Sequence, residues 1–584
     1  MTKFVTLLAF GACMTLSAAA YSDKETPQQQ FQRVSDEYFD HVYYRYQPTA
    51  GTVAGYHQYD SKLENLASAS IDAEVSALDD YEKRISSIAD ASLDQTTRAD
   101  RQLLLNQIRS RRLTLHTIRP WAKNADNYSS SCANAAFTLM ERKFAPADDR
   151  LRSLIAREKS MPGLLQEARA NLQNPPRIFT EIAIEQLPGI IAFFQHDVPL
   201  AFADANDEAL KSEFAKSNAA VIAELTSYLA WLKSDLLPRS NGDYRIGADT
   251  FSKKLACDEM VDLPLPKLLE IGYADLHRNQ QHFAEIAKEL EPNKTPREVL
   301  EELGHQHPAP DHLLDAFRGT FTSLLDFIRS HHIVTIPSDV TPVLEETPPF
   351  MRATTQASMD SPGPFETRAT TSYFNVTLPS PSMTPAQVEG YMHSYNIGTV
   401  ISTSVHEAYP GHYVQYLYSL KAPSRVRKIL QANTNIEGWA HYTEQMMLDN
   451  GYGQLGTGAK DDREVKFLRL GQLQDALLRN ARYIVGIQMH TGNMTYDQAV
   501  QFFQREGYQP QETSIVEAKR GAGDPTYLYY TLGKLEIMKL RSDLMKKQGS
   551  AFSLQKFHDD FLSQGFPPIK IIRETMLGDD SPTL

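Results

Sequence analysis

The segment His406-Glu407-Ala408-Tyr409-Pro410-Gly411-His412 places two histidines six residues apart, with a glutamate beside the first. In an unbroken α-helix, six residues turn the chain by roughly 600°, which leaves the two imidazoles about 120° apart on the helix surface. Pro410 cannot donate a hydrogen bond back to the carbonyl of His406, and Gly411 permits backbone angles closed to other residues. We therefore expect a helix bulge at Pro410 and Gly411 that returns His412 to the side of His406.

A second segment, Ile436-Glu437-Gly438-Trp439-Ala440-His441-Tyr442-Thr443-Glu444, places Glu437 25 residues after His412. Two imidazoles and a carboxylate are typical ligands of a catalytic zinc ion, so we predict one Zn²⁺ bound by His406, His412 and Glu437. Glu437, His441 and Glu444 lie at i, i+4 and i+7, on one helix face, and His441 and Glu444 are expected to orient the ligands. The alternative for either segment alone is chance spacing on a solvated helix.

Glu407 adjoins the first histidine and would face the open side of the ion. There a carboxylate can take a proton from bound water and later deliver it to a leaving amine. Zinc, in preference to manganese or cobalt, is inferred from ligand type alone, because imidazole and carboxylate accept several ions.

The composition is that of an ordinary globular protein of 584 residues with a formal net charge of −13. This charge argues against nucleic acid or an anionic membrane as the main partner, because both would repel the chain. Small molecules and peptides remain as substrates. The sequence does not indicate an oligomeric state.

The first twenty residues are typical of a signal peptide. Lys3 supplies positive charge, residues 5–16 form an apolar run, and residues 17–20 offer small side chains for cleavage near Ala20. We expect a periplasmic or secreted protein without a transmembrane segment, since the run is too short to span a bilayer. Lipid attachment at Cys13 is the less favoured alternative, because the residues before it match a lipobox poorly.

The cysteines and a group of three histidines each have a structural and a functional interpretation. Cys132 and Cys257 could pair in an oxidising compartment or remain buried thiols, and they are too few to form a thiolate metal site. His305, His307 and His312 lie in a proline-flanked loop with no carboxylate at a catalytic spacing. We interpret these histidines as surface residues and do not expect a second metal site.

Hydrophobic periodicity predicts a mainly α-helical protein with a small β segment near residues 333–380. Residues 21–332 form an N-terminal helical region, for example at 100–117 and 213–237. Residues 333–384 are rich in proline and β-branched side chains, with strands expected at 333–337 and 371–379, although an interdomain connection is the alternative. Residues 385–584 form a helical catalytic region, which begins at Thr384-Pro385-Ala386-Gln387 with an N-cap, a proline and a capping glutamine.

The chain resembles the bacterial domain-of-unknown-function family 885. The family's His-Glu-x-x-Pro-Gly-His-x-x-Gln and Glu-Gly-Trp-Ala-x-Tyr-x-Glu motifs are complete here as residues 406–415 and 437–444. The resemblance extends from about residue 48 to residue 574. It implies a large helical, groove-containing fold similar to gluzincin metallopeptidases, with His406, His412 and Glu437 as ligands and Glu407 as the base.

The resemblance also suggests two helpers for catalysis. His490 is the nearest match to a family Gly-x-His segment, with glutamine in place of the glycine, and Tyr530 matches a family tyrosine. A phenol or imidazole near the ion would share the charge of the oxyanion. For Tyr530 the alternative is core packing in a tyrosine-rich helix.

Three arginines, Arg479, Arg482 and Arg520, are candidates to bind the C-terminal carboxylate of a peptide, since guanidinium does so bidentately. They could equally be surface charges. We therefore expect an exported zinc peptidase of carboxypeptidase or dipeptidyl-carboxypeptidase type. The rival is a helical periplasmic binding or scaffold protein with a closed structural metal site that has His441 as fourth ligand.

Overall fold

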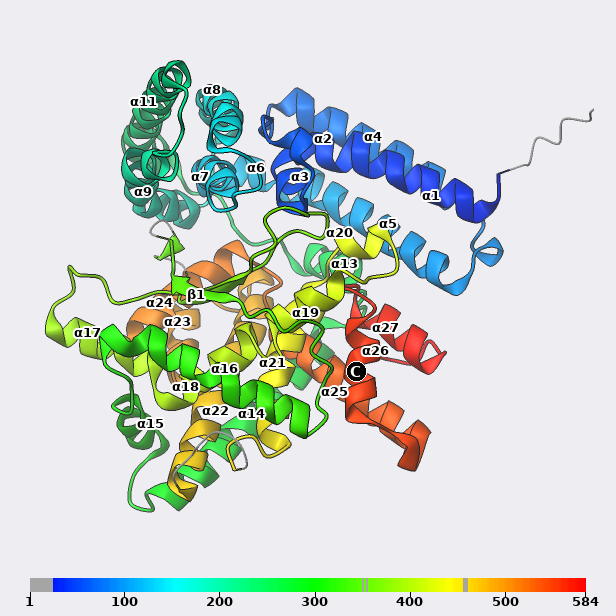
Figure 1. Ribbon diagram of the computed structural model, residues 1–584, viewed down its shortest axis with the longest axis vertical. Coiled ribbons are helices and arrows are strands. Elements are labelled where there is room, and N and C mark those ends of the chain that lie inside the picture. Colours follow the sequence, from blue (N-terminus) through cyan, green and yellow to red (C-terminus); the bar gives the residue numbers. More distant parts are fainter. Residues whose placement is uncertain (1–24, 349–350, 353–354, 455–460) are drawn as a thin grey trace, which may run out of the picture.

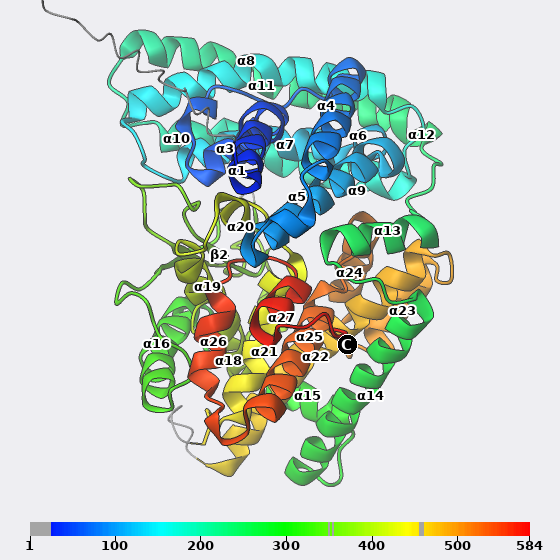
Figure 2. The same ribbon diagram turned by 90° about the vertical axis from the view of Figure 1, so that its right-hand side faces the viewer.

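The computed structural model describes residues 25–348, 351–352, 355–454 and 461–584. The fold is mainly helical with one small sheet, as predicted, and the helices form two layers (Figures 1 and 2). The predicted signal peptide and Cys13 lie outside the described residues.

The first layer is built from the N-terminal helices and lies uppermost in both views. It holds two hydrophobic cores, which form around Leu104 and Leu154. The helices predicted at 100–117 and 213–237 are confirmed as α5 and α11, each extended by a π-helical turn. The α-helices of this layer are α1 Pro27–Tyr38, α2 Tyr44–Tyr46, α3 Pro48–Ala54, α4 Ser68–Ser86, α5 Gln95–Leu113, α6 Pro120–Lys123, α7 Asp126–Met140, α8 Ala147–Asn171, α9 Arg177–Ala192, α10 Val198–Ala201, α11 Glu208–Trp231 and α12 Leu237–Arg239.

The second layer contains more of the chain than the sequence predicted. Helices α13 Ala248–Asp258, α14 Leu265–Leu290, α15 Pro296–Gly304 and α16 Leu313–Ser330 precede residue 332. Their apolar faces nevertheless share cores with C-terminal side chains: Phe283 clusters with Leu477, and Phe317 clusters with Trp439. The two layers therefore divide near residue 240, because the apolar stripes of α13 to α16 are complementary to the C-terminal helices.

A three-stranded sheet lies between the two layers (Figures 1 and 2). Its strands are β1 Val343–Glu346, β2 Ala357–Asp360 and β3 Tyr373–Val376, in the order β1-β3-β2, with β1 parallel and β2 antiparallel to β3. β3 confirms the strand predicted at 371–379. The strand predicted at 333–337 is wrong: Ile333 and Val334 are buried against helices, and the Thr335 N–H donates to Asp559.

The C-terminal helices complete the second layer. The capping box predicted at Thr384 is present, with Gln387 as its partner. The helices are α17 Pro385–Met392, α18 Ile397–Glu407, α19 His412–Ser419, α20 Arg425–Ile429, α21 Asn433–Asp449, α22 Asp462–His490, α23 Tyr496–Arg505, α24 Gln511–Gly523, α25 Tyr529–Gln548, α26 Leu554–Leu562 and α27 Ile569–Leu577.

Glycines allow two helix pairs in this layer to cross at backbone contact. A Cβ atom on Gly398 of α18 would lie 2.8 Å from the Cα of Gly471 in α22. A Cβ atom on Gly438 of α21 would lie 2.6 Å from the Cα of Gly533 in α25. Both distances are below normal van der Waals contact, so only glycine fits. These crossings fix α18 against α22 and α21 against α25.

One apolar helical stretch and two cysteines bear on the expected absence of a membrane span and on a possible disulfide. The stretch Arg177–Ala201 is long and apolar enough, by length and composition, to cross a membrane. In this structure its side chains Leu187, Phe193 and Phe194 are buried in a core with α7 and α8. Cys132 and Cys257 are both unpaired thiols, of which Cys132 is buried.

Candidate metal centre

The segment between the two histidines separates two helices. α18 ends at Glu407 and α19 begins at His412, so the predicted bulge inside one continuous helix is wrong in form. Gly411 lies so close to the end of α18 that a Cβ atom there would be 1.8 Å from the carbonyl oxygen of His406. The Trp439 indole N–H donates to the Pro410 carbonyl at 2.9 Å, which ties the break to α21.

The break brings the two imidazoles together, as the sequence predicted. Their ring centroids are 4.8 Å apart and the rings are nearly perpendicular. Oε2 of Glu437 lies 3.4 Å from Nε2 of His406 and 3.4 Å from Nε2 of His412. Both histidines are nearly buried, and this oxygen has no hydrogen-bond partner among the described residues.

Two of the three distances between these donor atoms match those of a tetrahedral metal site. Ligand atoms about 2.0–2.1 Å from zinc at tetrahedral angles are about 3.3–3.4 Å from one another. The glutamate oxygen has that separation from each imidazole nitrogen. The residues therefore fit zinc in type and in spacing, and the three described donors leave a fourth position for another group.

A hydrogen-bonded network holds the ligands in place. Nδ1 of His406 donates to Oε1 of Glu444 at 2.7 Å, so its Nε2 is free to bind a metal. The other oxygen of Glu444 lies 3.1 Å from Nδ1 of His441. Arg479 contacts Glu444 at 3.1 Å. Both residues predicted to orient the ligands are thus in the network, although His441 acts through Glu444.

The charges in this network explain how two carboxyl groups remain ionised inside the protein. Burial alone would raise the pKa of Glu444, but Arg479 and two imidazoles outweigh it and hold that pKa far below its usual range. Burial likewise opposes ionisation of Glu437, but His406 and His412 hold its pKa well below the usual value. Arg479 and the imidazoles therefore keep Glu437 and Glu444 ionised, and ionised carboxylates can bind a metal cation or accept hydrogen bonds.

Gln415, the last residue of the first motif, secures α19. Its side-chain amide donates to the side-chain oxygen of Asn435 at 2.9 Å. Asn435 in turn donates to the carbonyl of Pro567 at 2.7 Å. These bonds fix His412 on α19 relative to Glu437 on α21.

Two side chains beside the ligands are suited to chemistry. Oε2 of Glu407 is buried and has no hydrogen-bond partner within the described chain. Tyr416 was not predicted from the sequence. It lies one helical turn after His412, and the centroids of the two rings are 6.1 Å apart. Burial and the nearby carboxylates of Glu437 and Glu407 raise the pKa of Tyr416, so its phenol keeps its proton.

The three predicted arginines gather around Tyr530. Their guanidinium carbons lie 5.7, 5.0 and 5.9 Å from the ring centre, in the order Arg479, Arg482, Arg520. Arg482 forms two 2.7 Å bonds with buried Glu517. Arg520 donates to the Tyr530 hydroxyl at 3.1 Å, and within the described chain it has no carboxylate at ion-pair distance. Burial and the charge of Glu437 raise the pKa of Tyr530.

The structure does not bring His490 to these residues. It ends α22, eleven residues after Arg479, which corresponds to about 16 Å along the helix axis. Its Nε2 lies 2.8 Å from the Gly521 carbonyl and its ring packs against Tyr244. Burial lowers the pKa of His490 to about 4, so it is a neutral packed side chain.

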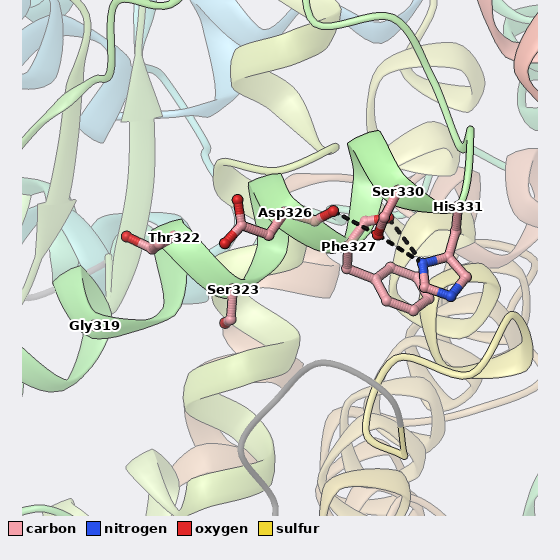
Figure 3. Close-up of a pocket in the computed structure, with 7 residues that line it drawn as sticks. All are labelled: Gly319, Thr322, Ser323, Asp326, Phe327, Ser330 and His331. Carbon is pink, nitrogen blue, oxygen red and sulfur yellow. Dashed lines mark hydrogen bonds between the residues drawn. The ribbon is translucent and has the colours of Figure 1, made fainter.

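A separate pocket of about 340 Å³ opens beside α16 and contains none of the predicted site residues. In Figure 3, Ser330 and His331 are joined by a hydrogen bond at one end of it. The residues that line it are Gly319, Thr322, Ser323, Asp326, Phe327, Ser330 and His331.

The chain belongs to a known family. The model of the family described as bacterial protein of unknown function (DUF885) matches residues 48–576, which confirms the resemblance seen in the motifs. No curated protein matches the sequence.

Two solved structures share the fold. A predicted lipoprotein of unknown function from Shewanella oneidensis is 27% identical, with a TM-score of 0.78, over 94% of this chain and 99% of that one. A predicted lipoprotein from Colwellia psychrerythraea is 18% identical, with a TM-score of 0.77, over 95% and 99%.

Proposed function

We propose that this protein is an exported zinc metallopeptidase that hydrolyses peptide bonds of oligopeptides. The observation that carries the proposal is the convergence of His406, His412 and Glu437, with the Glu437 oxygen at tetrahedral spacing from both imidazoles. Glu407 adjoins the first of these ligands. Three donors and an open position are typical of catalytic zinc, whereas structural zinc has four protein ligands. The likeness of the motifs to those of gluzincins supports the same conclusion.

The chemistry would be divided between the ion and the chain. Bound zinc would acidify a water molecule and polarise a peptide carbonyl. Glu407 has a free carboxylate oxygen that can take the proton from that water and pass it to the leaving amine. The phenols of Tyr416 and Tyr530, which keep their protons, can donate to the oxyanion. Such a donor lowers the activation barrier by about 2.7–4 kcal/mol.

The arginines favour cleavage near a peptide C-terminus. Glu444 and Glu517 neutralise Arg479 and Arg482. Arg520 is left as a cation beside Tyr530, with an exposed side chain. It can bind a terminal carboxylate through two hydrogen bonds. This supports a carboxypeptidase or dipeptidyl carboxypeptidase.

Export is proposed from the N-terminal sequence and the relatives. Residues 1–20 have the composition of a signal peptide, and both structural relatives are described as predicted lipoproteins. Cleavage near Ala20 would give a periplasmic or secreted chain, and Cys13 is the alternative point of lipid attachment.

The decisive experiment compares the parent protein with Glu407→Gln on a mixed peptide pool, with products read by mass spectrometry. Both proteins are loaded with zinc and their metal content is measured. We expect Glu407→Gln to retain zinc and to cleave about 10²–10⁴ times more slowly, because it lacks the proton acceptor. Glu213→Gln, a surface change of the same type at an exposed ion pair with Lys159, is the control.

Two results would contradict the proposal. Unchanged cleavage by Glu407→Gln would remove this residue as the base. Absence of cleavage by zinc-loaded parent protein would favour the scaffold, which would then need a fourth protein ligand. The candidate predicted for that role, His441, has no hydrogen-bond partner for its Nε2 among the described residues, but it is not in the group of side chains that converge on the site.

The polarity of cleavage is tested with Arg520→Gln on matched peptides that have a free or an amidated C-terminus. We expect the parent protein to prefer the free acid and the variant to lose that preference through a higher KM. Equal cleavage of both peptides by the parent protein would exclude a carboxylate receptor. A fall in kcat with an unchanged KM would mean that Arg520 acts by positioning the Tyr530 hydroxyl and does not bind the substrate carboxylate.

A further inference from the structure

A second group of histidines and carboxylates converges on the surface of the C-terminal layer. His305 and His307 follow α15. Both contact Glu389 from α17, which also contacts His393 from the short 3₁₀ turn His393–Tyr395. The sequence grouped the first two with His312, which instead lies against Asp315. His393 and Glu389 are more than 80 residues away in the chain, so only the fold brings the set together.

The distances within this group match a metal site. Oε1 of Glu389 lies 3.4 Å from Nδ1 of His305, 3.3 Å from Nε2 of His307 and 3.5 Å from Nε2 of His393. The His305 and His393 nitrogens are 3.1 Å apart. Four measured edges thus fall within about 0.3 Å of the tetrahedral separation of about 3.3–3.4 Å.

The surroundings prepare these atoms to bind a cation. Nδ1 of His307 donates to the Pro308 carbonyl at 2.8 Å, which places its proton there and leaves Nε2 with a free lone pair. Gly304 allows His393 to approach, since a Cβ atom at residue 304 would lie 3.0 Å from the His393 ring. Glu301 lies 3.8 Å from the other nitrogen of His393.

We propose that His305, His307, His393 and Glu389 form a second site for a divalent transition metal such as Zn²⁺. Three imidazoles and one carboxylate are ligands that zinc prefers, and four of the six edges between them have a tetrahedral separation. Four protein donors are typical of a structural zinc site, so we assign this site a structural role. The metal joins the end of α15 to α17 and to the start of α18, where Ile397 already donates to the Gln306 carbonyl at 2.8 Å.

The test measures zinc bound per chain in the full-length protein after removal of any histidine tag. The metal-free protein is dialysed against micromolar Zn²⁺, and zinc is counted by mass spectrometry for the parent, His393→Gln, His305→Gln and the control His312→Gln. We expect each of the first two variants to bind one zinc ion fewer than the parent, and the control to bind the same number. The difference is independent of occupancy at the buried centre.

Cobalt provides a second measurement. Co²⁺ bound to four ligands in a tetrahedron absorbs visible light strongly, so titration of a Glu437→Gln protein should produce that spectrum from the surface site alone. His393→Gln added to this background should abolish it. Equal zinc counts in parent, His393→Gln and His305→Gln, or an equal loss in His312→Gln, would overturn the proposal.

Discussion

The two histidine clusters use nearly the same ligand types in opposite settings. His406 and His412 are about 93–94% buried, whereas His305 has a side chain that is 56% exposed. The buried cluster has three donors and an unpaired carboxylate, Glu407, beside them. The surface cluster has four donors, and the carboxylate beside it, Glu301, is exposed to solvent. Ligand identity alone thus does not assign a role; the number of donors and their neighbours do.

Loss of a carboxylate ligand should separate the clusters most clearly. Glu437→Gln removes the charge between His406 and His412, and we expect zinc affinity at the buried centre to fall by more than about 100-fold, with loss of peptide cleavage. Glu389→Gln should lose surface zinc and retain cleavage. Metal content and product formation are measured on the same samples. Loss of cleavage in both variants would contradict the division of roles.

The next largest effect concerns the groups behind the ligands. Glu444→Gln removes the charge that accepts from His406 and pairs with Arg479, so zinc affinity at the buried centre should fall about 10–100-fold. Glu301→Gln is the matched change at the surface cluster. Its carboxylate is 69% exposed and 3.8 Å from His393, so a small change is expected. Calorimetric zinc titration that gave equal losses would contradict the contrast.

A third buried carboxyl tests whether cations are what keep Glu444 ionised. Burial raises the pKa of Glu158 to about 8 from 4.5, against a hydrogen bond from Ser217. Between those values the folded chain holds a proton that the unfolded chain has lost. The free energy of unfolding should therefore fall as pH rises, by about 1.4 kcal/mol per pH unit.

Glu158→Gln has no proton to lose and should remove this slope. Urea unfolding at pH 5, 6 and 7 measures it for the parent and the variant. The control is Glu213→Gln, at an exposed ion pair with Lys159. Parallel pH profiles for the parent and Glu158→Gln would refute the shifted titration.

The smallest expected effect is on the metal-free surface cluster. His305→Gln alters an exposed side chain, so the free energy of unfolding of the metal-free protein should change by about 0.5 kcal/mol or less. Thermal and urea unfolding without zinc provide the measurement. A loss of about 2 kcal/mol would mean that the cluster stabilises the fold without any ion.

Local signals allowed much of this arrangement to be predicted from sequence. The capping box at Thr384 and the β-branched run around Tyr373 are determined by neighbouring residues, and both were predicted. The apolar run at Ile333 was mistaken for a strand, because period alone does not separate a strand from a buried extended segment. The packing of α13 to α16 against the C-terminal helices was not predicted for a similar reason, since the partners of an apolar helix face are not visible in its own sequence.

The candidate centre was predictable to the extent that chemistry follows local spacing. Pro410 and Gly411 indicated that the helix could not continue, but not whether the chain bulges or breaks. Tyr416 had a usable signal, since it lies four residues after His412 on a helix. The surface cluster had none, because His393 reaches His305 through tertiary packing.

The contact between Gly398 and Gly471 has a consequence for substrate length. It joins α18, which bears His406, to α22, which bears Arg482, main chain against main chain. Neither helix can slide without a steric clash, so the separation of the candidate metal centre from Arg482 is nearly constant. If the protein cleaves peptides as proposed, a rigid distance between the metal and the arginine would determine how many residues are released at each cleavage.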